Sequence, residues 1–359
     1  MALTQLDILY DFEPKKLNYI DRKVVIYEKK VILVSTPKSG ASYLIFSHLR
    51  NYSKESYLYI DFSDYRIEKD ILANSLQSYI RKKGIILLVI EHFDFSFELP
   101  DCEEIIITTN IDKDIDGFSK KRLYPLDFEE YIAFEKRYNN IEHIFNSYAN
   151  TGTFPSIALS SDIDKIRNLQ TLISAMVINS KELDVLKEFS LYQSQKVSYY
   201  QIYKNLKQKL KISKDSLYKI VNDLERRGLL VFVEKFGSKN SAKKLFFIDF
   251  VIKNALTYKK EFLKRFENII FLELYKRDKK IYYSDDIDLF LPDEKKAILC
   301  IPFLPINLLK NKVLKRRKYF EKLGITEVKI ITLGNEDRFV YNSINFEVLP
   351  FWRWVAAEL

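Results

Sequence analysis

The stretch Lys30–Arg50, KVILVSTPKSGASYLIFSHLR, decides the fold of this chain. Residues 31–34 form a short apolar, largely β-branched run, which is typical of a strand buried in a parallel sheet. Residues 35–40 combine Ser, Thr, Pro and Gly and predict a tight turn. Tyr43, Phe46 and Leu49 then recur at helical spacing. Strand, small-residue turn and helix, in this order, are the context that a phosphate-binding loop requires.

The turn matches the nucleotide-binding pattern GxxxxGK[ST] only in part. Gly40 and Ser42 take the positions of the last Gly and the hydroxyl, but Ser35 replaces the first Gly and Ala41 replaces the Lys. In such a loop the amides and the helix N-terminus hold the phosphates, and the Lys neutralises their charge. The alternative is an ordinary strand–turn–helix that binds no nucleotide. The residues that we expect around a bound nucleotide are Lys38, Ser39, Gly40, Ala41, Ser42 and Tyr43.

Length and composition indicate a folded protein of two or three domains, with 359 residues, 47% hydrophobic and 30% charged. The longest apolar run, residues 85–90, is too short to cross a bilayer, and residues 1–12 do not have the pattern of a signal peptide. We therefore expect a cytoplasmic protein that does not enter a membrane. Cys102 and Cys300 fit two buried, reduced thiols.

The net charge of +9 is unevenly distributed. Residues 196–265 hold 18 Lys and Arg but only 6 Asp and Glu, whereas the rest of the chain has a net charge of −3. A basic block in an otherwise nearly neutral chain indicates a polyanionic partner such as DNA.

Three further apolar runs, within residues 57–61, 84–94 and 103–110, are separated by helical patterns and predict a parallel α/β sheet. Ligands of such sheets bind at the carboxyl ends of the strands. In a nucleotide hydrolase the second run should end in Asp-Glu, for Mg²⁺ and the attacking water. The best register aligns Ile90 and Glu91 with this pair, and the other aligns Glu91 and His92, which keeps an acid for the metal but loses the base. Glu91 is thus the candidate catalytic residue, and Asn110 is the candidate phosphate sensor at the end of the third run.

The segments KKRLYPLDFEEYIAFEKRY (residues 120–138) and FNSYANTGTFPSIAL (residues 145–159) are more specific. With them the chain resembles the bacterial and archaeal AAA-type (DEXX-box) ATPases that carry a C-terminal restriction-endonuclease-like domain. The resemblance implies ATP or ADP with Mg²⁺ as cofactors. It also implies a P-loop domain over residues 1–158, a helical linker and winged helix over 159–250, and a PD-(D/E)XK-like α/β domain over 251–359.

Three departures from that family affect the same chemistry. Ala41 replaces the loop Lys, Ile90 replaces the metal-binding Asp, and Phe118, after Gly117, takes the position of the arginine finger. Because all three groups balance the charge of the transferred phosphate, the resemblance implies that hydrolysis is largely lost. An ATPase or nucleotide-gated switch using Lys38, Ser42 and Glu91 is one alternative. An oligomeric or protein-binding scaffold is the other.

The basic block predicts a winged helix. A helix over residues 197–210 is followed by Ser213 as an N-cap, a second helix that ends at Gly228, and a hairpin over 229–249. In a helix-turn-helix the outward face of the second helix enters the major groove. A module that only packs or oligomerises is the alternative. The expected DNA contacts are Lys214, Tyr218, Lys219, Asn222 and Arg226 on the helix, and Lys239, Lys243 and Lys244 on the hairpin tip.

In the C-terminal part the resemblance implies a nuclease-like core. Glu267 and Asp288 match its first two metal-binding acids. Cys300 and Pro302 stand where the resemblance places the third acid or Gln and the Lys. Since Mg²⁺-assisted phosphate cleavage needs these groups, the resemblance implies at most a weak metal site and a lost nuclease activity.

Overall fold

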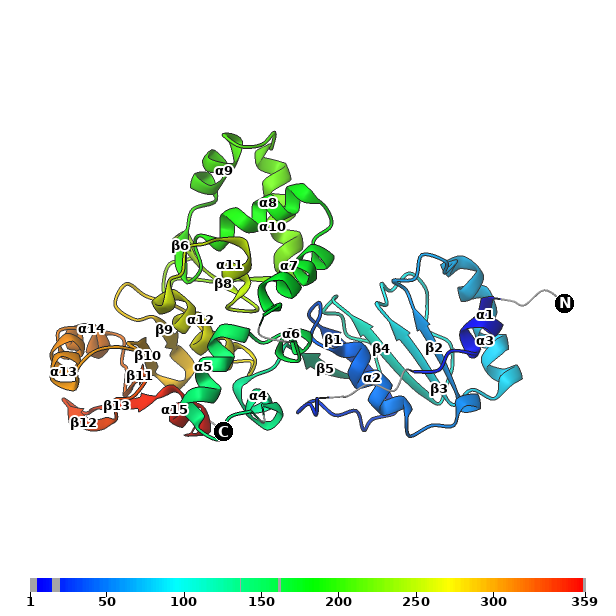
Figure 1. The fold of residues 1–359 in the computed structure, drawn as a ribbon, viewed down its shortest axis with the longest axis horizontal. Helices are drawn as coiled ribbons and strands as arrows, with labels where there is room; N and C mark the ends of the chain where they lie inside the picture. Colours follow the sequence, from blue (N-terminus) through cyan, green and yellow to red (C-terminus); the bar gives the residue numbers. More distant parts are fainter. Residues whose placement is uncertain (1–4, 15–19, 136, 161–162, 358–359) are drawn as a thin grey trace. The chain divides into compact units, whose positions relative to one another are not determined.

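The computed structural model describes residues 5–14, 20–135, 137–160 and 163–357. The chain forms two compact units, one of residues 1–126 and 154–156, the other of residues 127–153 and 157–359. Most of their helices and strands are labelled in Figure 1. The short helix α6 (Pro155–Ala158) includes residues of both units. Within the described ranges, every helix is too short or too polar to cross a bilayer.

The first unit is built on one five-stranded sheet, in which all strands are parallel and the order is β2-β3-β4-β1-β5. This confirms the predicted α/β class with a parallel sheet. The strands are β1 (Lys30–Ser35), β2 (Tyr57–Asp61), β3 (Leu87–Glu91), β4 (Glu104–Thr109) and β5 (Ser119–Leu123).

Helices pack on both faces of this sheet (Figure 1). On one face, Ile45 and Leu49 of α2 (Ala41–Leu49) pack in the same apolar cluster as Val89. On the other face, α1 (Gln5–Tyr10) and α3 (Lys69–Lys83) pack in a cluster that contains Ile90. A short 3₁₀ turn, Lys54–Ser56, precedes β2. Since side chains alternate along a strand, Glu91 belongs to the α2 face, like Val89.

The second unit begins with α4 (Phe128–Phe134) and α5 (Ile141–Thr151). Asp127 caps α4 in a capping box with Glu130. These two residues of the LYPLDFEEY sequence therefore fix the start of this helix. The predicted helical region 160–192 is two helices, α7 (Lys165–Met176) and α8 (Ser180–Ser190), and Asn179 caps the second. Residues 161 and 162 lie outside the described residues.

The middle of the second unit alternates helices with a small antiparallel sheet of order β6-β8-β7. Ser213 caps its longest helix, as predicted, by accepting a hydrogen bond from Ser216 N. The elements are α8, β6 (Gln195–Val197), α9 (Tyr199–Lys207), α10 (Lys214–Arg226), β7 (Leu230–Val233) and β8 (Lys243–Phe247), followed by α11 (Ile252–Leu256).

The C-terminal part of this unit is a mixed sheet of order β12-β13-β11-β10-β9 with helices around it. Strands β10, β11 and β13 are mutually parallel neighbours, and β9 and β12 pair antiparallel at the two edges. The buried helix α12 (Phe262–Tyr275) precedes the sheet. The other elements are β9 (Leu289–Leu291), a 3₁₀ turn (Pro292–Glu294), β10 (Lys296–Cys300), α13 (Ile306–Leu314), α14 (Arg317–Lys322), β11 (Glu327–Thr332), β12 (Asp337–Tyr341), β13 (Ile344–Pro350) and α15 (Phe351–Ala357).

Candidate functional site

The loop of residues 36–40 connects β1 to α2, as the sequence predicts. Its first amide, Thr36 N, donates to Leu123 O at 3.2 Å, and Ser39 N donates to Thr36 O at 3.2 Å. Gly40 has φ 94°, a left-handed conformation that glycine adopts without steric cost. Lys38 has φ 62°, which is unfavourable for a side chain with a Cβ atom. The loop is therefore a tight, partly strained turn at the carboxyl end of β1.

Arg22 holds this loop in place, and sequence reasoning missed it. Its guanidinium donates to Ser39 O and to Tyr124 O, each at 2.6 Å. Because the C=O and N–H of a trans peptide point in opposite directions, the N–H of Gly40 points away from Arg22. The arginine thus orients one loop amide, although it precedes the Lys30–Arg50 stretch and belongs to no motif.

Ser42, in the first turn of α2, is hydrogen-bonded to the end of β3. Its hydroxyl donates to Glu91 Oε2 at 2.8 Å, and the hydroxyl of Tyr59 donates to Glu91 Oε1 at 3.1 Å. Glu91 is 1% exposed, and burial raises the pKa of its carboxyl group although the Ser42 hydrogen bond opposes the shift. Burial also raises the pKa of Tyr59, next to this carboxylate. One carboxylate and two hydroxyls therefore meet beside the loop.

This geometry favours the second of the two sequence registers. Ile90 is fully buried in the cluster on the α3 face, whereas Glu91 reaches the hydroxyl of Ser42. In P-loop hydrolases the loop hydroxyl and an acid share the Mg²⁺ ion. In the predicted site, Glu91 would therefore take the position of the metal-side acid that the first register gives to Ile90, and His92 that of the water-positioning carboxylate.

His92 is fixed by the two neighbouring strands. Its Nδ1 lies 2.8 Å from Asp61 Oδ1 at the end of β2, and its amide donates to Thr108 Oγ1 at 3.0 Å in β4. The hydrogen bond with Asp61 raises the pKa of His92, while the nearby charge of Lys38 lowers it. His92 has φ 57°, so two non-glycine residues in the left-handed region, Lys38 and His92, flank the site. Such strain is concentrated at functional sites in proteins.

The remaining predicted nucleotide contacts lie on or near this edge of the sheet. Lys38 and Tyr43 are exposed, and Ser39 is buried in the loop. Ala41 begins α2 and provides no charge at the Lys position. Asn110 is exposed directly after β4, where Thr109 Oγ1 accepts a hydrogen bond from Ile111 N at 3.1 Å.

The Mg²⁺ that the resemblance implies is compatible with part of this arrangement. Mg²⁺ beside a nucleotide takes one or two protein oxygens and completes its shell with phosphates and waters. Ser42 and Glu91 are such a pair of oxygens. Among the described residues there is no group of three or more His, Cys, Asp or Glu side chains that could hold a metal by itself. Any ion here would therefore depend on the phosphates of a bound nucleotide.

In the second unit, the residues of α10 that are predicted to contact DNA lie on the exposed side of the helix. Leu217, Val221 and Leu224 are buried on one side of the helix. Arg226 donates to Asp223 at 2.9 Å, and Lys214 lies over the rings of Tyr200 and Tyr203 at 5.7 and 5.8 Å. The predicted DNA contacts of α10 are all exposed, namely Lys214, Tyr218, Lys219, Asn222 and Arg226.

The hairpin after α10 presents only part of the basic tip that the sequence predicts. Lys239 is exposed, but Lys243 forms an ion pair with Glu234 at 3.3 Å. Lys244 is 8% exposed and forms an ion pair with Glu267, so it is not available for the predicted contact with a nucleic acid. The physical reason is that β8 packs against α12, which turns its alternate side chains inward.

The two acids of the C-terminal part that are predicted to bind a metal, Glu267 and Asp288, also lie near Lys244. Burial raises the pKa of Glu267 to about 7, against the charge of Lys244. Asp288 Oδ2 accepts a hydrogen bond from Cys300 N at 2.8 Å. Burial raises the pKa of the Cys300 thiol well above its ordinary value. Pro302 brings no charge to the position that the resemblance assigns to a Lys.

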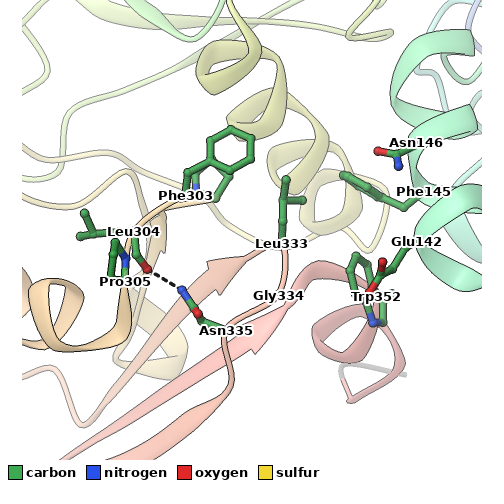
Figure 2. A pocket seen from close by; sticks show the side chains of 11 residues that line it. Glu142, Phe145, Asn146, Phe303, Leu304, Pro305, Leu333, Gly334, Asn335 and Trp352 are labelled. Atoms are coloured by element: carbon green, nitrogen blue, oxygen red, sulfur yellow. Dashed lines mark hydrogen bonds between the residues drawn. The ribbon is translucent and has the colours of Figure 1, made fainter.

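Pro302 instead lines a cavity of about 500 Å³. This cavity lies at the carboxyl ends of β10, β11 and β13 and is drawn in Figure 2. Phe303 and Trp352 also line it. Asn335 Nδ2 donates to Leu304 O at 2.5 Å, which ties two of its loops together, as Figure 2 shows. The carboxyl ends of parallel strands are common ligand positions, and the lining of this cavity is about equally polar and apolar.

No family model matches the chain. An uncharacterised protein of Methanocaldococcus jannaschii is 23% identical to it, over 95% of this chain and 92% of that protein. Among solved structures, the Walker-type ATPase of Pyrococcus abyssi aligns with 69% of this chain and 99% of its own length, with a TM-score of 0.46 and 14% identity.

Proposed function

We propose that this protein is a P-loop protein of the AAA type that hydrolyses little or no ATP and binds DNA through α10. The observation that carries the DNA-binding proposal is the exposed face of α10, where Lys214, Tyr218, Asn222 and Arg226 follow each other at intervals of four residues. This spacing aligns them in one stripe along the helix. Lysine and arginine contact phosphates, and asparagine and tyrosine add hydrogen bonds to bases or backbone.

The order of elements around α10 supports a winged helix. One helix and a short strand precede α9 and α10, and two antiparallel strands follow them. In this arrangement α10 takes the position of the recognition helix. Because Lys244 is buried against Glu267, we infer that phosphate contacts come from α10 and from Lys204 and Lys207 on α9, both exposed.

The loss of hydrolysis is supported by the groups around Ser42. Ala41 leaves the phosphates without the lysine that stabilises the transition state, and His92 stands where a carboxylate would orient water. Such charge stabilisation is most of the catalysis of phosphoryl transfer. ATP turnover by purified protein should not exceed the background rate. Turnover near 1 per second would contradict this part of the proposal.

Nucleotide binding without turnover is the second candidate function, because the Ser42–Glu91 pair and the oriented amide of Gly40 are retained. Calorimetry with ATP and Mg²⁺ tests it directly. Heat that is lost in a Ser42→Ala variant supports the candidate. No heat and no thermal shift with either nucleotide removes it.

DNA binding is tested with the triple variant Lys214→Ala, Lys219→Ala and Arg226→Ala in a shift assay at several salt concentrations. We expect affinity to fall at least tenfold and the salt slope to flatten by about 2 to 3, since each phosphate contact contributes about 0.9. The control changes Lys312, Lys315 and Lys318 to Ala, which removes the same charge from other exposed positions of the second unit. Unchanged affinity in the first variant, or an equal loss in the control, would refute the proposal.

A further inference from the structure

A buried charged cluster lies between the hairpin and the C-terminal sheet of the second unit. Lys244 of β8 is 8% exposed, Glu267 of α12 is 5% exposed, and their side chains form an ion pair. The same ammonium group lies 3.5 Å from the carbonyl oxygen of Asp288. The carboxylate of Asp288 accepts the amide hydrogen of Cys300 at 2.8 Å.

These residues do not fit the divalent metal that the resemblance implies at Glu267 and Asp288. The ammonium already neutralises Glu267, and one oxygen of Asp288 is used by the backbone. Cys300 takes the place of a third oxygen ligand, which hard cations such as Mg²⁺ require. A dication entering here would also be repelled by the buried positive charge of Lys244.

Lys244 lies on β8, and this strand packs closely against α12. The rings of Phe246 and Phe271 stack with centroids 4.0 Å apart and planes at 14°. The side-chain amide of Asn268 accepts from Phe247 N at 3.0 Å and donates to Phe247 O at 2.9 Å. The position of the ammonium group is therefore set by at least three independent contacts of β8 with α12, not by the ion pair alone.

We propose that the ammonium group of Lys244 is the permanent cation of the Glu267–Asp288 pair, in place of a divalent metal. The ion pair of Lys244 and Glu267, which we call the clamp, then holds β8 against α12 without a metal. This goes beyond DNA binding through α10, because it implies that the chain has no metal-dependent cleavage at this site whether or not DNA binds.

The first test measures Mn²⁺ binding to the full chain by paramagnetic resonance, in the wild type and in Glu267→Gln. The expected result is that the two proteins take up equal amounts of Mn²⁺. Uptake by the wild type that Glu267→Gln removes would overturn the proposal. If Glu267→Gln does not fold, Asp288→Asn serves as the comparison with the same two outcomes.

The second test uses Lys244→Met, with Lys243→Met as the matched control on the neighbouring, half-exposed lysine. Lys244→Met should lower Tm by about 5 to 10 °C, because it leaves a buried carboxylate without its partner. Lys244→Met with Glu267→Met should regain at least half of this loss, since both charges are then removed. A loss no larger than that of Lys243→Met, or no recovery in the double variant, would contradict the clamp.

Discussion

The hydroxyl of Ser42 lies 2.8 Å from Oε2 of Glu91, and this hydrogen bond joins the first turn of α2 to the last residue of β3. In the P-loop site that we propose, these two residues are the remaining pair, with Ala41 at the position of the lysine and His92 at that of the second acid. The pair can orient oxygens around a bound ion, but it carries no positive charge to balance a phosphate. Nucleotide binding and nucleotide hydrolysis therefore make different demands on this pair.

Removing the Glu91 side chain should destabilise the first unit. Glu91→Ala leaves the hydroxyls of Ser42 and Tyr59 without their acceptor and opens a cavity, so we expect a loss of about 2 to 3 kcal/mol in the free energy of unfolding. Urea unfolding followed by circular dichroism measures it. Glu103→Ala, which breaks an exposed ion pair with Lys29, is the control and should cost less than about 1 kcal/mol. Equal losses in the two variants would contradict a role for Glu91 in holding α2.

Returning a cation to the loop should restore affinity for phosphates. We expect Ala41→Lys to bind ATP with Mg²⁺ at least about tenfold more tightly than the wild type, because a charge-assisted hydrogen bond to a phosphate contributes about 1.4 kcal/mol or more. Calorimetry measures the dissociation constant. Ala41→Met is the control, with a side chain of similar length and no charge. If both variants bind alike, the loop does not face a phosphate.

The ion pair of Asp61 and His92 should make stability depend on pH. The pKa of His92 is raised above its ordinary 6.5, so its contribution is present below that value and is lost as pH rises through the raised pKa. Partial burial opposes the shift, but hydrogen bonds from His92 and Ser63 lower the pKa of Asp61 below 3.8, so its contribution is lost only as pH falls further. The pair therefore stabilises the first unit most between these two pKa values.

Asp61→Asn should thus reduce the free energy of unfolding more at pH 6 than at pH 9, by up to about 1 kcal/mol after screening of these half-exposed groups. Asp64→Asn is the control, because the partner of Asp64 is Arg66, which does not titrate in this range. The effect of the control should be the same at both pH values. A pH-independent effect of Asp61→Asn would show that His92 is neutral at pH 6.

Gly152 should not tolerate a side chain. It has φ 86°, and a Cβ atom there would lie 2.5 Å from Val251 Cγ2 and 2.6 Å from Asp249 Oδ1. We expect Gly152→Ala to cost about 3 kcal/mol or more in the free energy of unfolding of the second unit. Gly324→Ala is the matched control, since its φ is 65° but no atom lies within 4 Å of the added Cβ, and it should cost about 1 kcal/mol. Equal Tm values for the two variants would contradict this packing.

Much of the first unit follows from local sequence. The apolar runs of β1, β3 and β4 are long enough and uniform enough to predict buried parallel strands, and small residues with Gly40 predict the turn before α2. The amphipathic pattern of α10 and its cap, Ser213, were equally predictable, because period and capping are properties of neighbours along the chain.

The contacts of the sites were not predictable in the same way. Arg22 reaches the loop from outside every motif, and the choice between Ile90 and Glu91 depends on which face of β3 packs on α2. Lys244 stands in a basic segment that is typical of a DNA-binding hairpin, yet its side chain is buried against Glu267. A pattern of charges does not say which charges meet, since the partner comes from a different element.

The sequence by itself determined the order of strands, turns and helices and the absence of a lysine at position 41, because these are properties of single positions and of local periodicity. Only the tertiary structure decided that Glu91 meets Ser42 and that Lys244 meets Glu267. Pairs that lie 49 and 23 residues apart are set by how strands align in a sheet and how a hairpin packs on a helix, and no local pattern carries that information.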